Sequence, residues 1–191
     1  MRRREFFITT VVLAATLSGA SAFGAPQSIE MFDTPLKGAK RDQLRQVFKK
    51  NGMIPTREDS SYWVDLYDSN RMLQGATHFE VGYTMKAEEF AYARYTFPGS
   101  MNTGLVKDVI DLVVSKYGQP SKKNGQYHLG PVTATWMLGK NMKIEVSRGW
   151  PETTTYLSFI DIKSYSDMKL EMDNYEKKIK QQKAKEQGKA F

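Results

Sequence analysis

Residues 76–97 read ATHFEVGYTMKAEEFAYARYTF, and this stretch decides the fold class. Apolar and polar side chains alternate in two runs, over residues 76–85 and again over residues 90–97. Successive side chains of a β-strand point to opposite faces of the sheet, so each run predicts a strand with one buried and one wetter face. The side chains expected on the buried face are Phe79, Val81, Tyr83, Met85, Ala91, Ala93, Tyr95 and Phe97.

A predicted helix precedes these strands. Within residues 40–51, Leu44, Val47 and Phe48 follow the i, i+3, i+4 spacing of one helical face. Gly52 then suits the left-handed position that commonly ends a helix. Residues 40–51 are therefore expected to form an amphipathic helix that packs against the sheet.

The same order of elements repeats in the second half of the chain. A second helix is expected over residues 103–117, ending at Gly118, and its apolar positions align with those of the first helix. The remaining strands are expected at residues 62–67, 132–138, 142–146 and 154–160. Two α-β-β-β units in an antiparallel sheet packed by helices, an α+β fold, are therefore predicted. Coincidence is the alternative for so short an alignment.

The N-terminus has the features of an export signal. Three arginines precede an apolar run at residues 6–17, and small residues follow, up to Ala22. This order predicts a cleavable signal peptide at residues 1–22, and the run is too short for a membrane anchor. Arg3 and Arg4 also resemble a twin-arginine motif, although any basic signal start is the simpler interpretation. We expect the protein in the periplasm or outside the cell.

Charge and length define the rest of the organisation. The formal charge of +7 includes +2 in residues 1–22 and +4 in residues 176–191, so the body between them is near +1. A nucleic-acid partner is therefore not expected, because it would need a basic face on the body. Residues 23–39 are expected to form an extended lead-in, and residues 40–162 a single α+β domain. The chain has no Cys, so the fold uses no disulfide.

In element order, the predicted domain resembles small envelope domains of the BamE (SmpA/OmlA) family and of the β-lactamase-inhibitor-protein-like fold. The resemblance covers residues 40–160 and includes the helix ending KYGQP at residues 116–120. It includes no functional motif, and the lipidation Cys usual in BamE is absent. It implies a sheet with helices on one face and the other face open to a protein partner.

Catalytic and metal-binding motifs are not found in the sequence. His78 is expected on a wet strand face and His128 in a loop, and neither has metal-ligand spacing around it. Asp65 and Glu80 could share one sheet face, but carboxylates on a wet face are usually only solvated. No nucleophile elbow and no phosphate-binding glycine loop is present. We therefore expect no cofactor and no catalytic site.

Aromatic and charged residues make the outer sheet face a candidate for binding a protein. The residues predicted to meet a partner are Trp63, Tyr67, Tyr92, Arg94 and Trp150. Large aromatics beside mixed charges are typical of the centre of a protein interface. Two alternatives remain open: the C-terminal helix covers this face, and Trp150, at a hairpin tip, folds back as a lid on the core.

The C-terminal residues 163–191 are predicted to form an amphipathic helix with a basic tail. Apolar residues follow a 3-4 spacing at Tyr165, Met168, Met172, Tyr175 and Ile179. Beyond them the pattern turns polar and lysines accumulate, including Lys180, Lys183 and Lys185. The first half is expected to dock on the protein's own sheet or on a partner. The second half is expected to stay solvated and to contact an anionic membrane surface weakly.

These patterns favour an exported, non-enzymatic envelope protein that binds another protein, and the expected partner is another envelope protein. One alternative is a periplasmic hydrolase with a site that the sequence does not reveal. The other is a periplasmic protein that binds a small ligand or a lipid. An apolar cavity would favour the ligand binder, and a polar cleft with perturbed carboxylates would favour the enzyme. No pattern in the sequence sets an oligomeric state.

Overall fold

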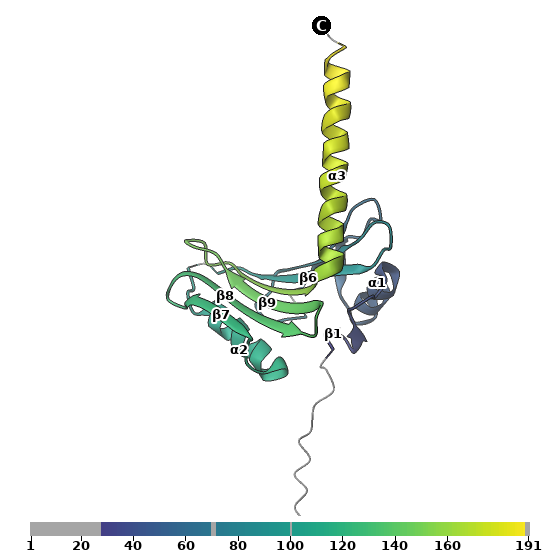
Figure 1. The fold of residues 1–191 in the computed structure, drawn as a ribbon. Helices are drawn as coiled ribbons and strands as arrows, with labels where there is room; N and C mark the ends of the chain where they lie inside the picture. Colours follow the sequence, from purple (N-terminus) through teal and green to yellow (C-terminus); the bar gives the residue numbers. More distant parts are fainter. Residues whose placement is uncertain (1–27, 70–71, 100, 190–191) are drawn as a thin grey trace, which may run out of the picture.

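An eight-stranded antiparallel sheet, in the order β3-β4-β5-β6-β10-β9-β8-β7, forms the body of the protein (Figure 1). The structure is a computed structural model, and it describes residues 28–69, 72–99 and 101–189. The sheet strands are β3 (Ile54–Arg57), β4 (Val64–Asp68), β5 (His78–Tyr83), β6 (Phe90–Phe97), β7 (Lys122–Gln126), β8 (Leu129–Leu138), β9 (Met142–Arg148) and β10 (Thr155–Asp161). The predicted α+β class with an antiparallel sheet is confirmed.

The sheet is built from two units of the same element order. Helix α1 (Arg41–Lys50) precedes β3 to β6, and helix α2 (Leu105–Tyr117) precedes β7 to β10. The units meet at the centre of the sheet, where β6 pairs with β10 from Phe97 opposite Thr155 to Tyr92 opposite Ile160. Each unit therefore has four strands, and the prediction of three strands in each was wrong.

The additional strands, β3 and β7, lie at the two edges of the sheet. Their sequences, IPTR and KKNGQ, have no alternation, and every residue in them is exposed. Proline and lysine at an edge discourage pairing with another chain, so these residues suit their position. A strand with no buried face leaves no period-two pattern in the sequence, and this is why both strands were missed.

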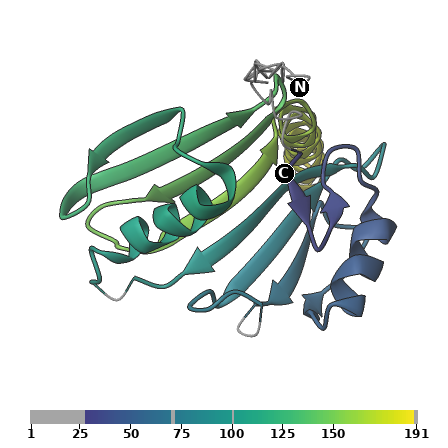
Figure 2. The same ribbon diagram turned by 90° about the horizontal axis from the view of Figure 1, so that it is seen from below.

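Helices α1 and α2 cover the same face of the sheet and enclose the core with it (Figure 2). Phe48 of α1 packs edge-on against the rings of Tyr67 and Phe79, with centroid distances of 5.3 and 5.5 Å. The hairpin of β1 (Glu30–Met31) and β2 (Thr34–Pro35) lies on this face too. Buried side chains of residues 29–39 join the core, so this segment is more than an extended lead-in.

Helix α3 (Ile162–Gln187) follows β10 directly and rises from the opposite side of the sheet (Figure 1). The Asp161 side chain caps it by accepting a hydrogen bond of 3.0 Å from the Ser164 backbone N–H. Its 26 residues make it about 39 Å long. In the part of the chain that the structure describes, no helix is long and apolar enough to cross a membrane. The predicted signal peptide, residues 1–22, lies outside that part.

Candidate functional site

The first half of α3 is seated on the outer face of the sheet, opposite α1 and α2. Met168 is 2% exposed and lies over Gly82 of β5, where a Cβ atom would overlap the Tyr92 ring and crowd the methionine sulfur. The Tyr92 ring in turn packs against Tyr165 of α3, with 5.3 Å between centroids. The missing side chain at Gly82 therefore makes the seat for both the ring and the helix.

Glu171 fastens α3 to the loop that follows β5. Its carboxylate accepts hydrogen bonds from the Met85 backbone N–H at 2.7 Å and from the Trp63 indole N–H at 3.3 Å. The Trp63 ring also meets Tyr175 of α3, with 5.3 Å between centroids. The predicted docking of the first half of the helix is thus observed on the protein's own sheet.

A groove of about 370 Å³ lies between the docked part of α3 and the outer face of the sheet. Polar side chains dominate its sheet side, and α3 forms the other side. Its lining residues are Val64, Tyr92, Arg94, Glu145, Ser147, Tyr156, Ser158, Ile160, Tyr165, Met168, Lys169 and Met172. We call this the outer groove.

Arg94 occupies the middle of the sheet at the outer groove. It forms an ion pair with Glu80 on the neighbouring strand, and the Tyr92 hydroxyl donates a hydrogen bond of 3.0 Å to the same carboxylate. The guanidinium also lies 5.1 Å from the Tyr156 ring centroid and 5.9 Å from that of Tyr92. Its side chain is still 41% exposed, so a partner can reach it.

Strand register brings further charged and hydroxyl groups into the same row as Arg94. Ser158 lies opposite Arg94 on β10, and Glu145 lies opposite Ser158 on β9. Lys143 forms an ion pair of 3.0 Å with Glu145. The outer groove therefore presents hydroxyl groups between mixed charges, a surface that can form many directional hydrogen bonds.

Tyr67 does not belong to this face, and its predicted placement was wrong. The ring is 2% exposed in the core, where its hydroxyl donates a hydrogen bond of 2.7 Å to Glu58. Burial raises the Tyr67 pKa above its ordinary value, and the Glu58 carboxylate adds to the shift. On β4 it is Val64 and Leu66 that face outward, although they are the apolar residues of the alternation.

The carboxylates of Asp65 and Glu80 lie on opposite faces of the sheet. Asp65 is fully buried and forms a bidentate pair with Arg45 of α1, with both N–O distances 2.8 Å. The hydrogen bonds that Arg45 donates to Asp65 raise the Arg45 pKa further, against the effect of burial. The two acids therefore cannot work as a pair. Among the described residues, no group of three or more acidic, His or Cys side chains is placed to hold a metal.

Trp150 is separate from the outer groove. It follows β9 at the end of the sheet away from the start of α3, and its ring is 45% exposed. Its centroid lies 5.9 Å from the buried guanidinium of Arg148. One side of the ring thus covers an internal charge while the rest faces solvent, which combines the two interpretations that the sequence left open.

The partner-binding role predicted for the remaining aromatic residues stays a prediction. Trp63 and Tyr92 are engaged by α3, as the alternative interpretation expected, while Arg94 and Trp150 keep free surface. Sequence reasoning missed Tyr156 and Ser158 as groove residues, although they alternate with the buried Leu157 along β10. His78 and His128 are both exposed, the former on its strand and the latter in a turn.

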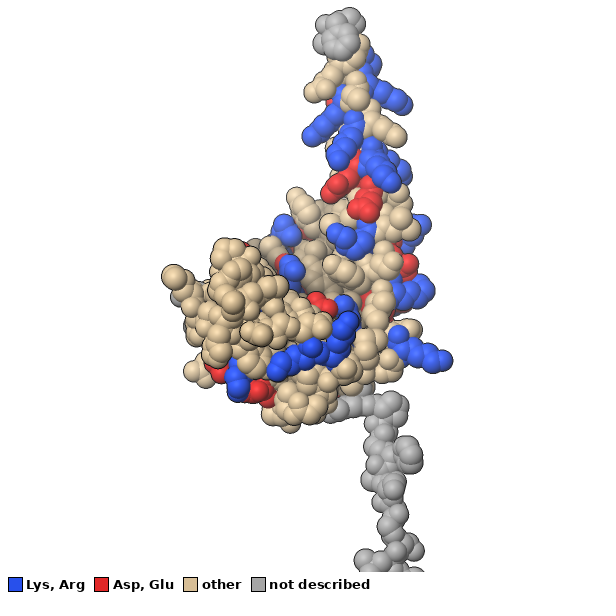
Figure 3. Space-filling view, turned by 60° about the vertical axis from the view of Figure 1, so that its left-hand side comes forward, with Lys and Arg blue, Asp and Glu red and all other residues tan. Residues whose placement is uncertain are grey.

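Lysines surround the projecting half of α3. Figure 3 shows blue side chains on both sides of this part of the helix. We call this projecting half the arm. Its residues Lys180, Lys183 and Lys185 are exposed and form no ion pair with any described residue, and Lys177 and Lys178 just before them are exposed too. The arm has cationic groups around its circumference, without an apolar face of the kind that lies in a membrane interface.

Comparison with known proteins assigns no family. No protein-family model matches the chain, and no curated protein matches it. The chain is similar to the crystal structure of a DUF4309 family protein (YjgB) from Bacillus subtilis, with a TM-score of 0.43 and 14% identity. The match covers 70% of this chain and 87% of that chain. A likeness of this degree carries neither a family nor a function to the chain.

Proposed function

We propose that the protein is exported and binds another protein, without catalysis, through the outer groove and the adjoining surface of α3. The observation that carries the proposal is the open outer face: α1 and α2 cover only the other face, and α3 covers only part of this one. The strands β7 to β9 thus present their outward side chains to solvent beside the groove.

The chemistry of this face suits a protein partner. Arginine and tyrosine are the residue types that most often dominate binding energy at protein interfaces, and Arg94 with Tyr156 forms such a cluster. Both nearby acids, Glu80 and Glu145, already hold a cation in an ion pair. The groove therefore resembles the polar centre of an interface more than an acid–base pair poised for hydrolysis.

The projecting lysines support a second, weaker contact with an anionic membrane surface. Each lysine near a charged membrane contributes about 1 kcal/mol, and salt screens that attraction. The contact would bring the outer groove to a partner at that surface.

Site-specific photo-crosslinking in living cells tests the proposal. A photoreactive residue at Ser147 or Tyr156 should capture one protein partner, and a position on the arm such as Lys180 should capture the same protein or lipid near it. Leu129, 66% exposed on β8 away from α3, is the matched control and should capture neither. Equal capture from all positions would contradict the proposal.

Sequencing the N-terminus of the exported protein tests processing, since an intact Met1 would contradict the signal peptide.

A further inference from the structure

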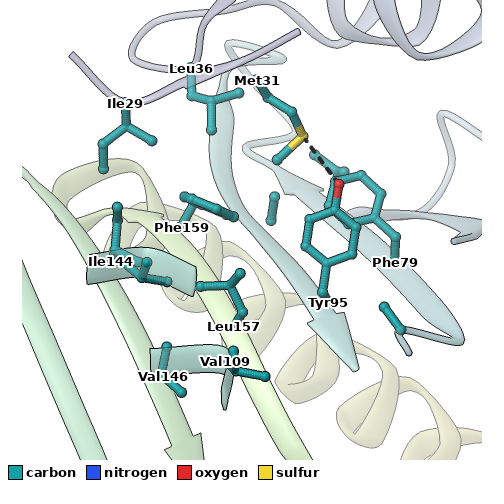
Figure 4. Packing of buried hydrophobic residues seen from close by; sticks show 14 of the residues in the cluster. Ile29, Met31, Leu36, Phe79, Tyr95, Val109, Ile144, Val146, Leu157 and Phe159 are labelled. Carbon is teal, nitrogen blue, oxygen red and sulfur yellow. Dashed lines mark hydrogen bonds between the residues drawn. The ribbon is translucent and has the colours of Figure 1, made fainter. Parts of the chain in front are cut away.

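Ser158 has a free hydroxyl group on the sheet side of the outer groove. It lies on β10 between Leu157 and Phe159, whose side chains point into the core (Figure 4), so its own side chain points to the outer face. The residue is 8% exposed, and its hydroxyl has no hydrogen-bond partner among the described residues. Unlike the Tyr83 hydroxyl, which is sealed from solvent, it opens into the groove. Buried polar groups are nearly always hydrogen-bonded, so Ser158 offers an unused donor to an acceptor atom that enters the groove.

The ionic groups of the outer groove leave one positive charge uncompensated. Arg94 and Glu145 lie on either side of Ser158 in strand register, and each is already held in the ion pair described above. These two pairs add no net charge. Lys169 lines the α3 side of the groove, is exposed, and forms no ion pair with a described residue. The groove therefore favours an anion that carries a single charge.

We propose that the outer groove binds a carboxylate group of the protein partner, with Ser158 and Arg94 as hydrogen-bond donors and Lys169 as the compensating charge. The inference rests on the proposed function and names the chemistry that the partner presents. An ionised carboxylate only accepts hydrogen bonds, which matches these donors. A phosphate monoester carries a charge of about −1.5 to −2 at neutral pH, so Glu145 would repel it more strongly. An Asp or Glu side chain or the C-terminus of the partner chain can supply the carboxylate.

NMR titration of the isotope-labelled chain tests the site with probes that need no identified partner. The chain from residue 23 to residue 191 is used, because it contains every helix and strand that the structure describes. N-acetyl-glutamate N-methylamide presents a side-chain carboxylate, and acetyl-glycyl-glycine presents a terminal one. N-acetyl-glutamine N-methylamide is the uncharged control. Saturable shifts of the Ser158 and Lys169 amide signals are expected with a carboxylate probe and not with the glutamine probe, and the tighter of the two carboxylates identifies the source.

Substitutions separate the groove from the general charge of the chain. Ser158→Ala removes the hydroxyl and should weaken carboxylate binding about tenfold. Lys169→Gln should weaken it by up to about fivefold, as expected for a charge at an exposed site. Lys177→Gln removes the same charge from an exposed position on the arm and is the matched control, so it should change nothing. The spectrum of each variant also shows whether its fold is intact.

The outcomes distinguish this site from the proposed function. Equal binding of the glutamate and glutamine probes overturns the carboxylate site, and so does equal weakening by Lys169→Gln and Lys177→Gln. Tighter binding of inorganic phosphate than of either carboxylate overturns it too. If the photoreactive residues capture a partner while neither carboxylate probe binds, the carboxylate site is wrong and the proposed function stands. If a carboxylate probe binds as expected and no protein is captured, the site stands and the protein-binding function fails.

Discussion

Gly82 places α3 on the sheet, because a Cβ atom there would overlap the Tyr92 ring and crowd the sulfur of Met168. Its conformation is open to other residues, so the requirement is one of space and not of backbone geometry. We predict that Gly82→Ala loosens the docked half of the helix and lowers the free energy of unfolding by about 1–3 kcal/mol. Hydrogen exchange of the α3 amides measures the loosening directly.

Gly149→Ala is the matched control for this substitution. A Cβ atom at Gly149 meets only the Glu152 carbonyl oxygen, at an ordinary contact distance of 3.9 Å. Its effect on helix protection should therefore be negligible. Equal protection of α3 in the unchanged chain and in the Gly82→Ala variant would show that the helix does not need this seat.

Arg148 is a buried cation that joins three parts of the second unit. Its guanidinium, 1% exposed, donates to the backbone carbonyls of Thr103, Tyr127 and Gly130 at 2.6–2.7 Å. Arg148→Met leaves these acceptors buried without a donor, and we predict a loss of about 3 kcal/mol in the free energy of unfolding. Chemical denaturation measures it. Arg94→Met, at a half-exposed guanidinium, should lower the free energy of unfolding by no more than about 1 kcal/mol. Equal losses in the two variants would contradict the structural role assigned to Arg148.

The free energy of unfolding should fall in the alkaline pH range, because four tyrosines are buried. Burial is the main cause that raises the pKa of Tyr67, Tyr83, Tyr92 and Tyr95, the last to about 12 from an ordinary value of 10.0. The unfolded chain therefore loses these protons first, so their contribution is complete below pH 10 and declines as the pH rises toward 12. The loss should be about 1.4 kcal/mol per pH unit for each tyrosine.

Urea denaturation from about pH 9 to about pH 11 measures this decline. The free energy of unfolding should fall less steeply with pH in Tyr95→Phe than in the unchanged chain, by the contribution of one tyrosine. The lysines titrate alike in both proteins, so the difference between the two slopes reports Tyr95 alone. A slope that is the same in the unchanged chain and in the variant would contradict the assignment to Tyr95.

At the scale of elements, α3 divides into a docked half and a projecting half. The docked half buries Met168, and that side chain alone contributes roughly 1.5–3 kcal/mol. Truncation after Lys163 removes the docked half of α3, including Met168 and Glu171, so we predict a large loss of stability or aggregation. Truncation after Gln182 removes residues 183–191, and those of them that the structure describes, 183–189, are all exposed, so the melting temperature should stay nearly unchanged. Differential scanning calorimetry compares the two, and an unchanged melting temperature in the shorter chain would refute docking.

Periodicity predicted the elements that bury one face and missed those that bury none. Residues 76–85 and 90–97 alternate because their inner side chains reach the core, and β5 and β6 lie there. The edge strands β3 and β7 are exposed on both faces, so no pattern in the sequence records them. The apolar spacing of α3 predicted docking as far as Ile179, and the helix does dock, with the ring contact to Trp63 at Tyr175.

The candidate site was predicted less well, because alternation tells which residues share a face but not which face is buried. On β4, apolar Val64 and Leu66 face outward, while Asp65 and Tyr67 turn inward to Arg45 and Glu58. A buried ion pair of this kind depends on a residue distant in sequence, so the residues of the strand itself do not predict it. Arg94 was placed correctly on the outer face because its strand follows the simple rule.

For the whole molecule, the two units together make one sheet with two different faces. The face under α1 and α2 contains the core, and the outer face contains Arg94 beside the docked part of α3. The helix projects from the outer face only, so its lysines and the outer groove lie on the same side. This arrangement would let one partner contact both.

The measurement that tests this account most directly is the affinity of the captured partner protein for variants of the outer groove. Calorimetric titration should show binding to the unchanged chain and a loss of at least about tenfold with Arg94→Ala, because a buried arginine at an interface is worth about 2 kcal/mol or more. Leu129→Ser, on the exposed part of β8, should bind as the unchanged chain does. Full affinity in the Arg94→Ala variant, with its fold intact, would contradict the central claim that the outer groove is the binding site.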